Sequence, residues 1–91
     1  MKPNEIQFAH NLKALSAPQC RRIVEALVEE SHTFKGLSQR CKLTPASIEK
    51  HLQILTQAGL IKIRSVGGVQ KVHLQTSKFK PTLDWFSKLS T

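Results

Sequence analysis

Residues 43–60 read LTPASIEKHLQILTQAGL, and their pattern predicts one helix with a marked start and end. Thr44 is a favourable N-cap residue, and Pro45 suits the first helical position because the N–H that proline lacks would be unpaired there. Gly59 is placed to end the helix in a left-handed conformation. Apolar residues recur three and four positions apart. The expected buried stripe is Ile48, Leu52 and Leu55.

A shorter helix is expected just before this one. Thr33 is its predicted N-cap, and only Lys42 and Leu43 separate its end from Thr44. Two helices joined by so tight a turn predict a helix-turn-helix. Its inward-facing residues are expected to be Phe34, Leu37 and Cys41.

Two helical segments precede this motif. Asn4 with Gln7 offers a capping box for a first helix that runs to about Leu15. Ser16 with Gln19 offers a second capping box, at the start of a second helix. The predicted apolar stripe of the second helix comprises Cys20, Ile23, Val24, Leu27 and Val28.

From Leu60 the hydrophobic period changes from helical to alternating. Apolar and basic residues alternate over Ile61–Arg64, and Val69–Gln75 can return as a partner strand. Gly67-Gly68 is a two-residue turn that tolerates the positive φ values a tight hairpin requires. The pattern predicts a hairpin with one apolar and one basic face, followed by a last helix from about Pro81 to Leu89.

Length and composition predict a single globular domain over residues 1–91. The chain has 91 residues, of which 40% are hydrophobic and 22% charged, and its mean hydropathy is −0.25. So short a chain has a marginal core, which a second subunit would support. No apolar run approaches the length of a bilayer span, and Met1–Glu5 opens no signal peptide. We therefore expect a cytoplasmic protein with no membrane partner.

The net charge is +8 and the isoelectric point is near 10.0, which favours a polyanionic partner. All of the excess positive charge lies after Thr33. A helix-turn-helix followed by a basic hairpin predicts a winged helix-turn-helix, mainly α with a small β-hairpin, in the order α-α-α-α-β-β-α. In this fold the second helix of the motif enters the major groove of double-stranded DNA.

The helix over residues 45–57 is therefore the expected recognition helix. Its small outward residues allow close approach to base edges, Lys50 can donate to guanine, and Gln53 can pair with adenine. Basic residues in the turn and the hairpin are expected to contact phosphates. For each polar residue alone, a solvated surface is the alternative. The predicted DNA-binding residues are Lys42, Thr44, Ala46, Ser47, Glu49, Lys50, His51, Gln53, Lys62, Arg64 and Lys71.

Four segments carry a resemblance to a known family: LKALSAP at 12–18, RIV at 22–24, LTPASIEKHL at 43–52 and LTQAGLI at 55–61. They resemble the ArsR family of bacterial winged-helix repressors, over nearly the whole chain. The resemblance implies a homodimer that packs through its first and last helices, binds a palindromic operator and represses transcription. It also implies a structural, partly packed place for His51 on the recognition helix.

Several positions depart from the family pattern. The Cys-x-Cys motif of metal-sensing members is replaced by Thr33–Lys35, and the last helix has only Asp84 for the alternative metal site. Cys20 occupies a position in the second helix where the family usually has an arginine. Glu49 occupies a position in the recognition helix where the family has a serine, and its carboxylate is unfavourable beside DNA unless it accepts from cytosine N4. We therefore expect no metal and no cofactor.

The remaining candidates are thiols and aromatic residues. Cys20 and Cys41 are expected to be small apolar core residues, with a redox switch between two facing thiols as the alternative. The effector is left open as an unknown small molecule or a redox signal. Trp85 and Phe86 indicate an interface. The predicted dimer interface comprises Ile6, Phe8, Leu12, Leu83, Trp85, Phe86 and Leu89.

The expected function is sequence-specific DNA binding by a homodimeric repressor. No catalytic arrangement is visible, because the chain has no tyrosine and no serine in a nucleophile elbow, so no enzyme is expected. Two alternatives remain. A protein-interaction module is favoured by Glu49 and the uncharged glycine tip of the hairpin. A nonspecific architectural DNA binder would show steep salt dependence with little sequence preference.

Overall fold

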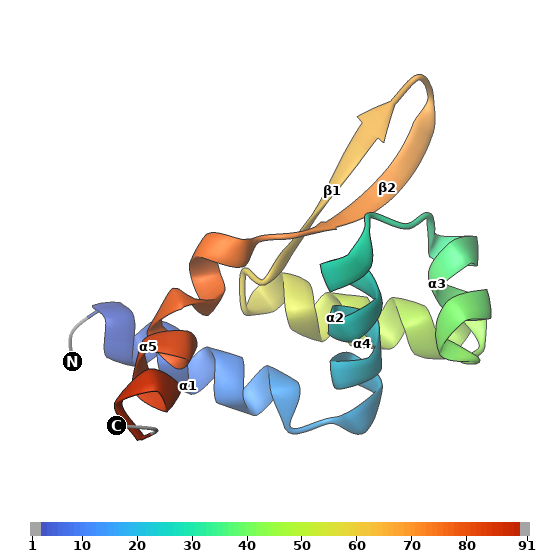
Figure 1. Ribbon diagram of the computed structural model, residues 1–91. Helices are drawn as coiled ribbons and strands as arrows, with labels where there is room; N and C mark the ends of the chain where they lie inside the picture. Colours follow the sequence, from blue (N-terminus) through green and yellow to red (C-terminus); the bar gives the residue numbers. More distant parts are fainter. Residues whose placement is uncertain (1–2, 90–91) are drawn as a thin grey trace.

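The computed structural model describes residues 3–89, and it follows the predicted order of helices and hairpin (Figure 1). The two strands form an antiparallel hairpin that projects from the helices, and α1 lies beside α5 at the opposite end. Within the described range, no helix is long and apolar enough to cross a membrane. The elements are α1 (Pro3–Leu15), α2 (Pro18–Glu29), α3 (Phe34–Cys41), α4 (Pro45–Gln57), β1 (Ile61–Val66), β2 (Val69–Leu74), the 3-10 helix η1 (Thr76–Phe79) and α5 (Lys80–Leu89).

The predicted capping of the helix-turn-helix is confirmed. The hydroxyl of Thr33 accepts a hydrogen bond of 3.0 Å from the backbone N–H of Gly36, and that of Thr44 accepts one of 3.1 Å from Ser47. Lys42 adopts a left-handed conformation with φ 55°, which helps to turn the chain from α3 into α4 within the three residues Lys42 to Thr44. These bonds orient the first turn of each helix.

The predicted cap of α2 is wrong. Ala17, not Ser16, is the N-cap residue, because Pro18 occupies the first helical position and Ser16 lies one residue too early. The Ser16 hydroxyl instead donates to the carbonyl of Lys13 at 2.6 Å. Arg21 donates to the carbonyl of Ser16 at 3.1 Å, so a guanidinium from α2 helps to close the connection.

Asn4, the predicted cap of the first helix, has a side chain outside the described part. Its predicted partner Gln7 has other contacts: its amide nitrogen donates to Asn11 Oδ1 and to the carbonyl of Ala58, each at 2.8 Å. Gln7 therefore joins α1 to the end of α4.

The hairpin has the predicted two faces. Ile63 pairs with Val72, and Arg64 pairs with Lys71 in the next register position. Directly paired residues share a face and successive residues alternate, so apolar and basic pairs separate to opposite sides. The turn glycines Gly67 and Gly68 have φ values of 58° and 79°, as a tight hairpin turn requires.

The core is formed by α2, α3, α4 and the base of the hairpin. Two predicted core positions are wrong: Val28 is 68% exposed and Phe34 is 38% exposed. Ala26, which the stripe prediction omitted, is buried instead, because the face of α2 that the other elements cover is turned toward Ala26 and away from Val28. The largest fully buried apolar side chains are Ile23, Leu37, Ile48, Leu55, Leu60 and Val72.

Two features of the fold were not predicted. The segment before α5 forms η1, and Phe79 at its end packs against the core. The loop between α2 and α3 also joins the hairpin, because His32 and Val72 exchange backbone hydrogen bonds of 3.2 and 2.7 Å. This bridge fixes the base of the hairpin to the helix-turn-helix.

Candidate nucleic-acid interface

Helix α4 has one buried and one exposed side. Its apolar stripe is buried as predicted, with Leu55 fully inaccessible and Ile48 and Leu52 nearly so. The opposite edge carries short or polar side chains: Ser47 is half-buried, and Ala46, Glu49, Lys50 and Gln53 are exposed. This edge leaves room for another molecule to approach the helix closely.

His51 is turned toward the body of the protein. It is only 8% exposed, and its Nδ1 lies 2.7 Å from the backbone oxygen of Ser47 on the preceding turn. The thiol of Cys20 on α2 donates a long hydrogen bond of 3.8 Å to the carbonyl of His51. These contacts support the structural place that the family resemblance implies for His51.

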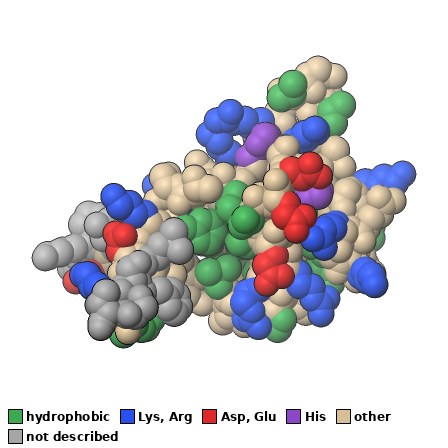
Figure 2. Space-filling view, viewed as in Figure 1, with side chains coloured by type: hydrophobic (Ala, Val, Ile, Leu, Met, Phe, Trp, Pro, Cys, Tyr) green, Lys and Arg blue, Asp and Glu red, His purple; other side chains and the backbone are tan. Residues whose placement is uncertain are grey.

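The predicted basic residues of the hairpin lie on one face. Lys62 pairs with His73, and Arg64 pairs with Lys71, with Arg64 and Lys71 exposed. In Figure 2, Lys and Arg side chains lie beside the lower part of the hairpin, and hydrophobic side chains lie next to its tip. The tip residue Val66 is 65% exposed. Positive charge therefore lies along the strands and not at the turn.

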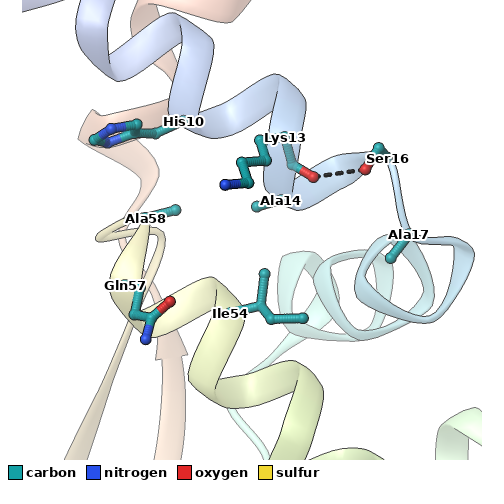
Figure 3. Close-up of a pocket in the computed structure, with 8 residues that line it drawn as sticks. All are labelled: His10, Lys13, Ala14, Ser16, Ala17, Ile54, Gln57 and Ala58. Carbon is teal, nitrogen blue, oxygen red and sulfur yellow. Dashed lines mark hydrogen bonds between the residues drawn. The ribbon is translucent and has the colours of Figure 1, made fainter.

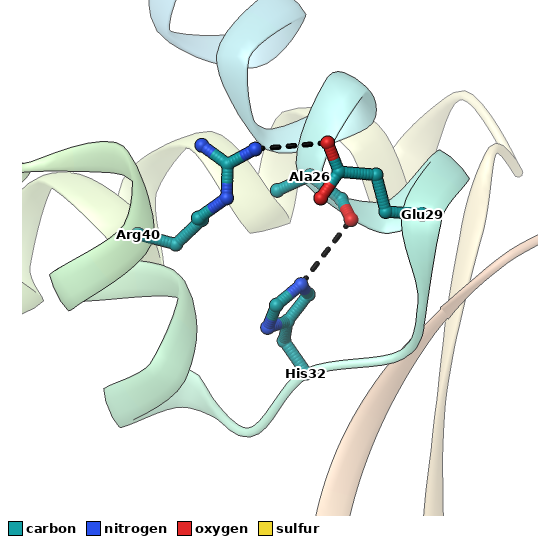
Figure 4. Close-up of polar contacts among 4 residues, drawn as sticks. All are labelled: Ala26, Glu29, His32 and Arg40. Atoms are coloured by element: carbon teal, nitrogen blue, oxygen red, sulfur yellow. Dashed lines mark hydrogen bonds and ion pairs between the residues drawn. The ribbon is translucent and has the colours of Figure 1, made fainter.

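The helix-turn-helix is further fixed by polar contacts (Figure 4). Arg40 on α3 forms an ion pair of 2.9 Å with Glu29 on α2, and both side chains are more than half exposed. Such a pair contributes about 0 to 1 kcal/mol. His32 lies in the loop between α2 and α3, and its ring is 3.2 Å from the carbonyl of Ala26 on α2. Arg40 is thereby engaged with an acid, whereas the predicted contact residue Lys42 is exposed in the turn.

The described members of the predicted dimer interface are apolar residues of α1 and α5, and on α1 Phe8 and Leu12 share one flank while Ile6 lies on the other. Ile6, Leu12 and Leu89 are 41%, 45% and 64% exposed. The half-buried ring of Phe8 lies 5.3 Å from the ring of Trp85, centroid to centroid, at a tilt of 50°. The side chains of the two other predicted members, Leu83 and Phe86, lie outside the described part.

Both cysteines are buried and free. Burial raises the pKa of the Cys20 thiol above its ordinary value, and burial outweighs nearby Arg40 in raising that of Cys41. Protonated thiols react slowly, which favours the core interpretation over a redox pair. Among residues 3–89, no three His, Cys, Asp or Glu side chains gather where they could hold a metal ion.

The sequence prediction missed a buried polar network that joins α1 to the end of α4 and to the segment around the start of α5. Asn11 is fully buried, and its amide nitrogen donates to the carbonyl of Lys78 at 2.8 Å and to the hydroxyl of Thr82 at 2.9 Å. Its oxygen accepts from Gln7, which also reaches Ala58. The available signal was that Gln7, Asn11 and Ala14 share one face of α1 at helical spacing.

These features define a winged helix-turn-helix DNA-binding protein. A family model described as a helix-turn-helix domain matches residues 15–64, and the chain belongs to this family. No curated protein matches the sequence. The predicted fold class is confirmed.

Solved structures confirm the resemblance to ArsR-family regulators at the level of the fold. An ArsR-like transcriptional regulator from Rhodococcus sp. RHA1 is 21% identical, with a TM-score of 0.83, over 94% of this chain and 81% of that one. The transcriptional repressor BigR from Xylella fastidiosa is 23% identical, with a TM-score of 0.74, over 94% and 86%. A homodimeric winged helix-turn-helix DNA-binding domain from Mycobacterium bovis is 17% identical, with a TM-score of 0.73, over 97% and 87%.

Proposed function

We propose that this protein is a homodimeric transcriptional repressor that binds a palindromic operator in the cytoplasm. In this proposal residues 1–91 form one DNA-binding domain with dimerisation helices at both ends. The observation that carries it is the division of α4 into a buried apolar stripe and an exposed polar edge beside a basic hairpin face.

The proposed contacts divide into two groups. Lys50 and Gln53 read base edges, and the small residues Ala46 and Ser47 let the backbone approach the groove. The basic turn and hairpin residues hold phosphates, which position the protein without specifying sequence. The N-terminal turn of α4, capped by Thr44, adds backbone N–H groups that favour a phosphate. The phosphate group comprises Lys42, Lys62, Arg64 and Lys71.

Dimerisation is proposed through the apolar surface of α1 and α5. Burial of Leu12 and the Phe8–Trp85 pair against a second copy removes exposed apolar area from water, at roughly 25 cal/mol per Å². A two-fold dimer presents two α4 helices to adjacent major grooves, about 34 Å apart. The small core also gains support from a second subunit.

A protein-interaction module is the second candidate. Glu49 is exposed on the edge of α4, and the tip of the hairpin carries Val66 and Val69 instead of a basic residue. Both features oppose DNA binding, because an unpaired carboxylate is unfavourable beside phosphates and an uncharged tip gains nothing from them.

Fluorescence anisotropy with two duplexes tests the proposal. The DNA upstream of the protein's own gene and a scrambled duplex of equal length are titrated over a range of salt. A repressor prefers the upstream duplex by at least about 10³. Equal affinity with a steep salt slope would indicate an architectural DNA binder, and absence of binding to both would indicate the interaction module.

A further inference from the structure

We infer that the cavity between α1 and α4 binds a small carboxylate with a compact apolar body. The cavity has a volume of about 400 Å³ and lies where the end of α1, the start of α2 and the last turns of α4 meet (Figure 3). This volume is at the lower end of the range of about 300 to 1,000 Å³ that is usual for ligand sites. It suits a small ligand.

The apolar side of the cavity is made by small residues. Ala14, Ala17 and Ala58 line it together with Ile54, and both Ala14 and Ala58 are buried. An apolar group placed against these side chains would remove their exposed apolar surface from water, at roughly 25 cal/mol per Å².

The polar side of the cavity carries positive charge. Lys13 extends its ammonium group across the opening, and His10 and Gln57 lie on the same rim (Figure 3). The side chains of Lys13 and Gln57 can both donate hydrogen bonds, and none of the lining residues is acidic. A carboxylate is the group that this rim favours, since a hydrogen bond between ions is stronger than one between neutral groups.

The cavity stays open in a dimer that packs through the Phe8 flank of α1. Phe8, Leu12 and Leu15 follow one another at helical spacing along this flank, whereas Ile6 lies with His10 and Lys13 on the other flank. A partner that covers the Phe8 flank therefore leaves the cavity accessible.

The cavity is also connected to the recognition helix. Ile54 and Gln57 belong to the last turns of α4, and Ala58 ends that helix and accepts the hydrogen bond from Gln7 on α1. A ligand between α1 and α4 would therefore lie beside the contact through which α1 holds the end of α4. This regulatory step rests on the proposed function, whereas binding of the ligand does not.

The test is two-dimensional NMR on the unbound dimer, with phenylacetate as the probe and phenylacetamide as its neutral match. We expect saturable shifts of the backbone amides of Ala14, Ala17 and Ile54, with phenylacetate bound about tenfold more tightly than phenylacetamide. Lys13→Ala should lose that preference. Lys35→Ala, an exposed lysine on α3, is the matched control and should keep it.

Three results would overturn the inference: no saturable shift with phenylacetate at tens of millimolar, shifts confined to other surfaces, or equal affinity for the acid and the amide. A DNA titration with and without phenylacetate separates the regulatory step. Unchanged DNA affinity in the saturated protein would refute regulation and leave the ligand site intact. If the protein binds no DNA, the proposed repressor function is wrong, but the NMR result on ligand binding is unaffected.

Discussion

The side-chain amide of Gln7 on α1 donates a hydrogen bond of 2.8 Å to the carbonyl of Ala58, at the C-terminal end of α4. The same nitrogen donates to Asn11, which in turn donates to Thr82 on α5. One chain of hydrogen bonds therefore links both terminal helices to the end of the recognition helix. Because Asn11 is fully buried and Thr82 is only 6% exposed, neither side chain could pair with solvent if the bond between them were lost.

Replacement of Asn11 should destabilise the fold strongly. Asn11→Leu keeps the branched shape of the side chain but leaves the buried Thr82 hydroxyl without its donor, at about 1 to 3 kcal/mol, and also removes the donor to the Lys78 carbonyl. Urea denaturation measures the free energy of unfolding. The control Gln53→Leu, on the exposed edge of α4, should change it by less than about 0.5 kcal/mol. Equal effects of the two variants would contradict a structural role for the network.

Lys50 and Arg64 should differ in how they affect DNA binding. If Lys50 reads a base, Lys50→Ala weakens specific binding by about 1 to 3 kcal/mol and relaxes sequence preference. If Arg64 holds a phosphate, Arg64→Ala weakens binding to all duplexes alike and lowers the salt slope by about 1. Anisotropy titrations at several salt concentrations measure both effects, with Lys80→Ala on α5 as the control. A uniform loss for Lys50→Ala would place Lys50 on phosphate.

Glu49 gives a second test of the same surface. If α4 enters the groove and Glu49 accepts no base donor, Glu49→Gln removes a repelled carboxylate and tightens binding to all duplexes. If Glu49 accepts from cytosine N4, the same change weakens binding only where that cytosine is present. If Glu49→Gln changes the affinity for none of the duplexes, this edge of α4 lies away from DNA.

Leu12 should control dimerisation. It is 45% exposed, so Leu12→Glu leaves the fold of the monomer intact but places a charge in the proposed interface, at a cost of several kcal/mol. Sedimentation velocity over a range of concentrations should show a monomer. Val28→Glu is the control, because Val28 is 68% exposed on α2 and away from α1 and α5. If both variants remain dimeric, the dimer interface lies elsewhere.

Buried Cys20 should make the fold less stable at alkaline pH. Burial raises its pKa in the folded state above the ordinary value of 9.0, so the unfolded chain loses this proton first as the pH rises. The contribution of the thiol to stability is therefore complete below about pH 9 and is lost above it. Urea denaturation from pH 7 to 10 should show a shallower decline for Cys20→Ala than for the original chain. Parallel curves would mean that Cys20 is not protected from solvent.

Local features of the fold were predictable from the sequence, because the residues that cause them are neighbours. Thr44 caps α4 through Ser47, three residues away, and the turn at Gly67 needs only its own backbone freedom. Contacts between distant segments were not predictable in this way. The bridge from His32 to Val72 and the bond from Gln7 to Ala58 depend on how complete helices pack.

The candidate interface follows the same division. The exposed edge of α4 was predictable, since a helix with one apolar stripe must turn its other side outward. The exposure of Val28 and Phe34 was not, because it depends on where neighbouring elements end. The cavity beside Lys13 was also missed, since it arises from three alanines on different elements that meet only in the folded chain.

The most direct test of the account is a hydroxyl-radical footprint of the protein on DNA from upstream of its gene. Two α4 helices in a symmetric dimer should protect two half-sites related by a two-fold axis, with centres about 34 Å or 10 base pairs apart, and Lys50→Ala should weaken the protection of both together. A single protected half-site, or uniform protection along the duplex, would contradict the account.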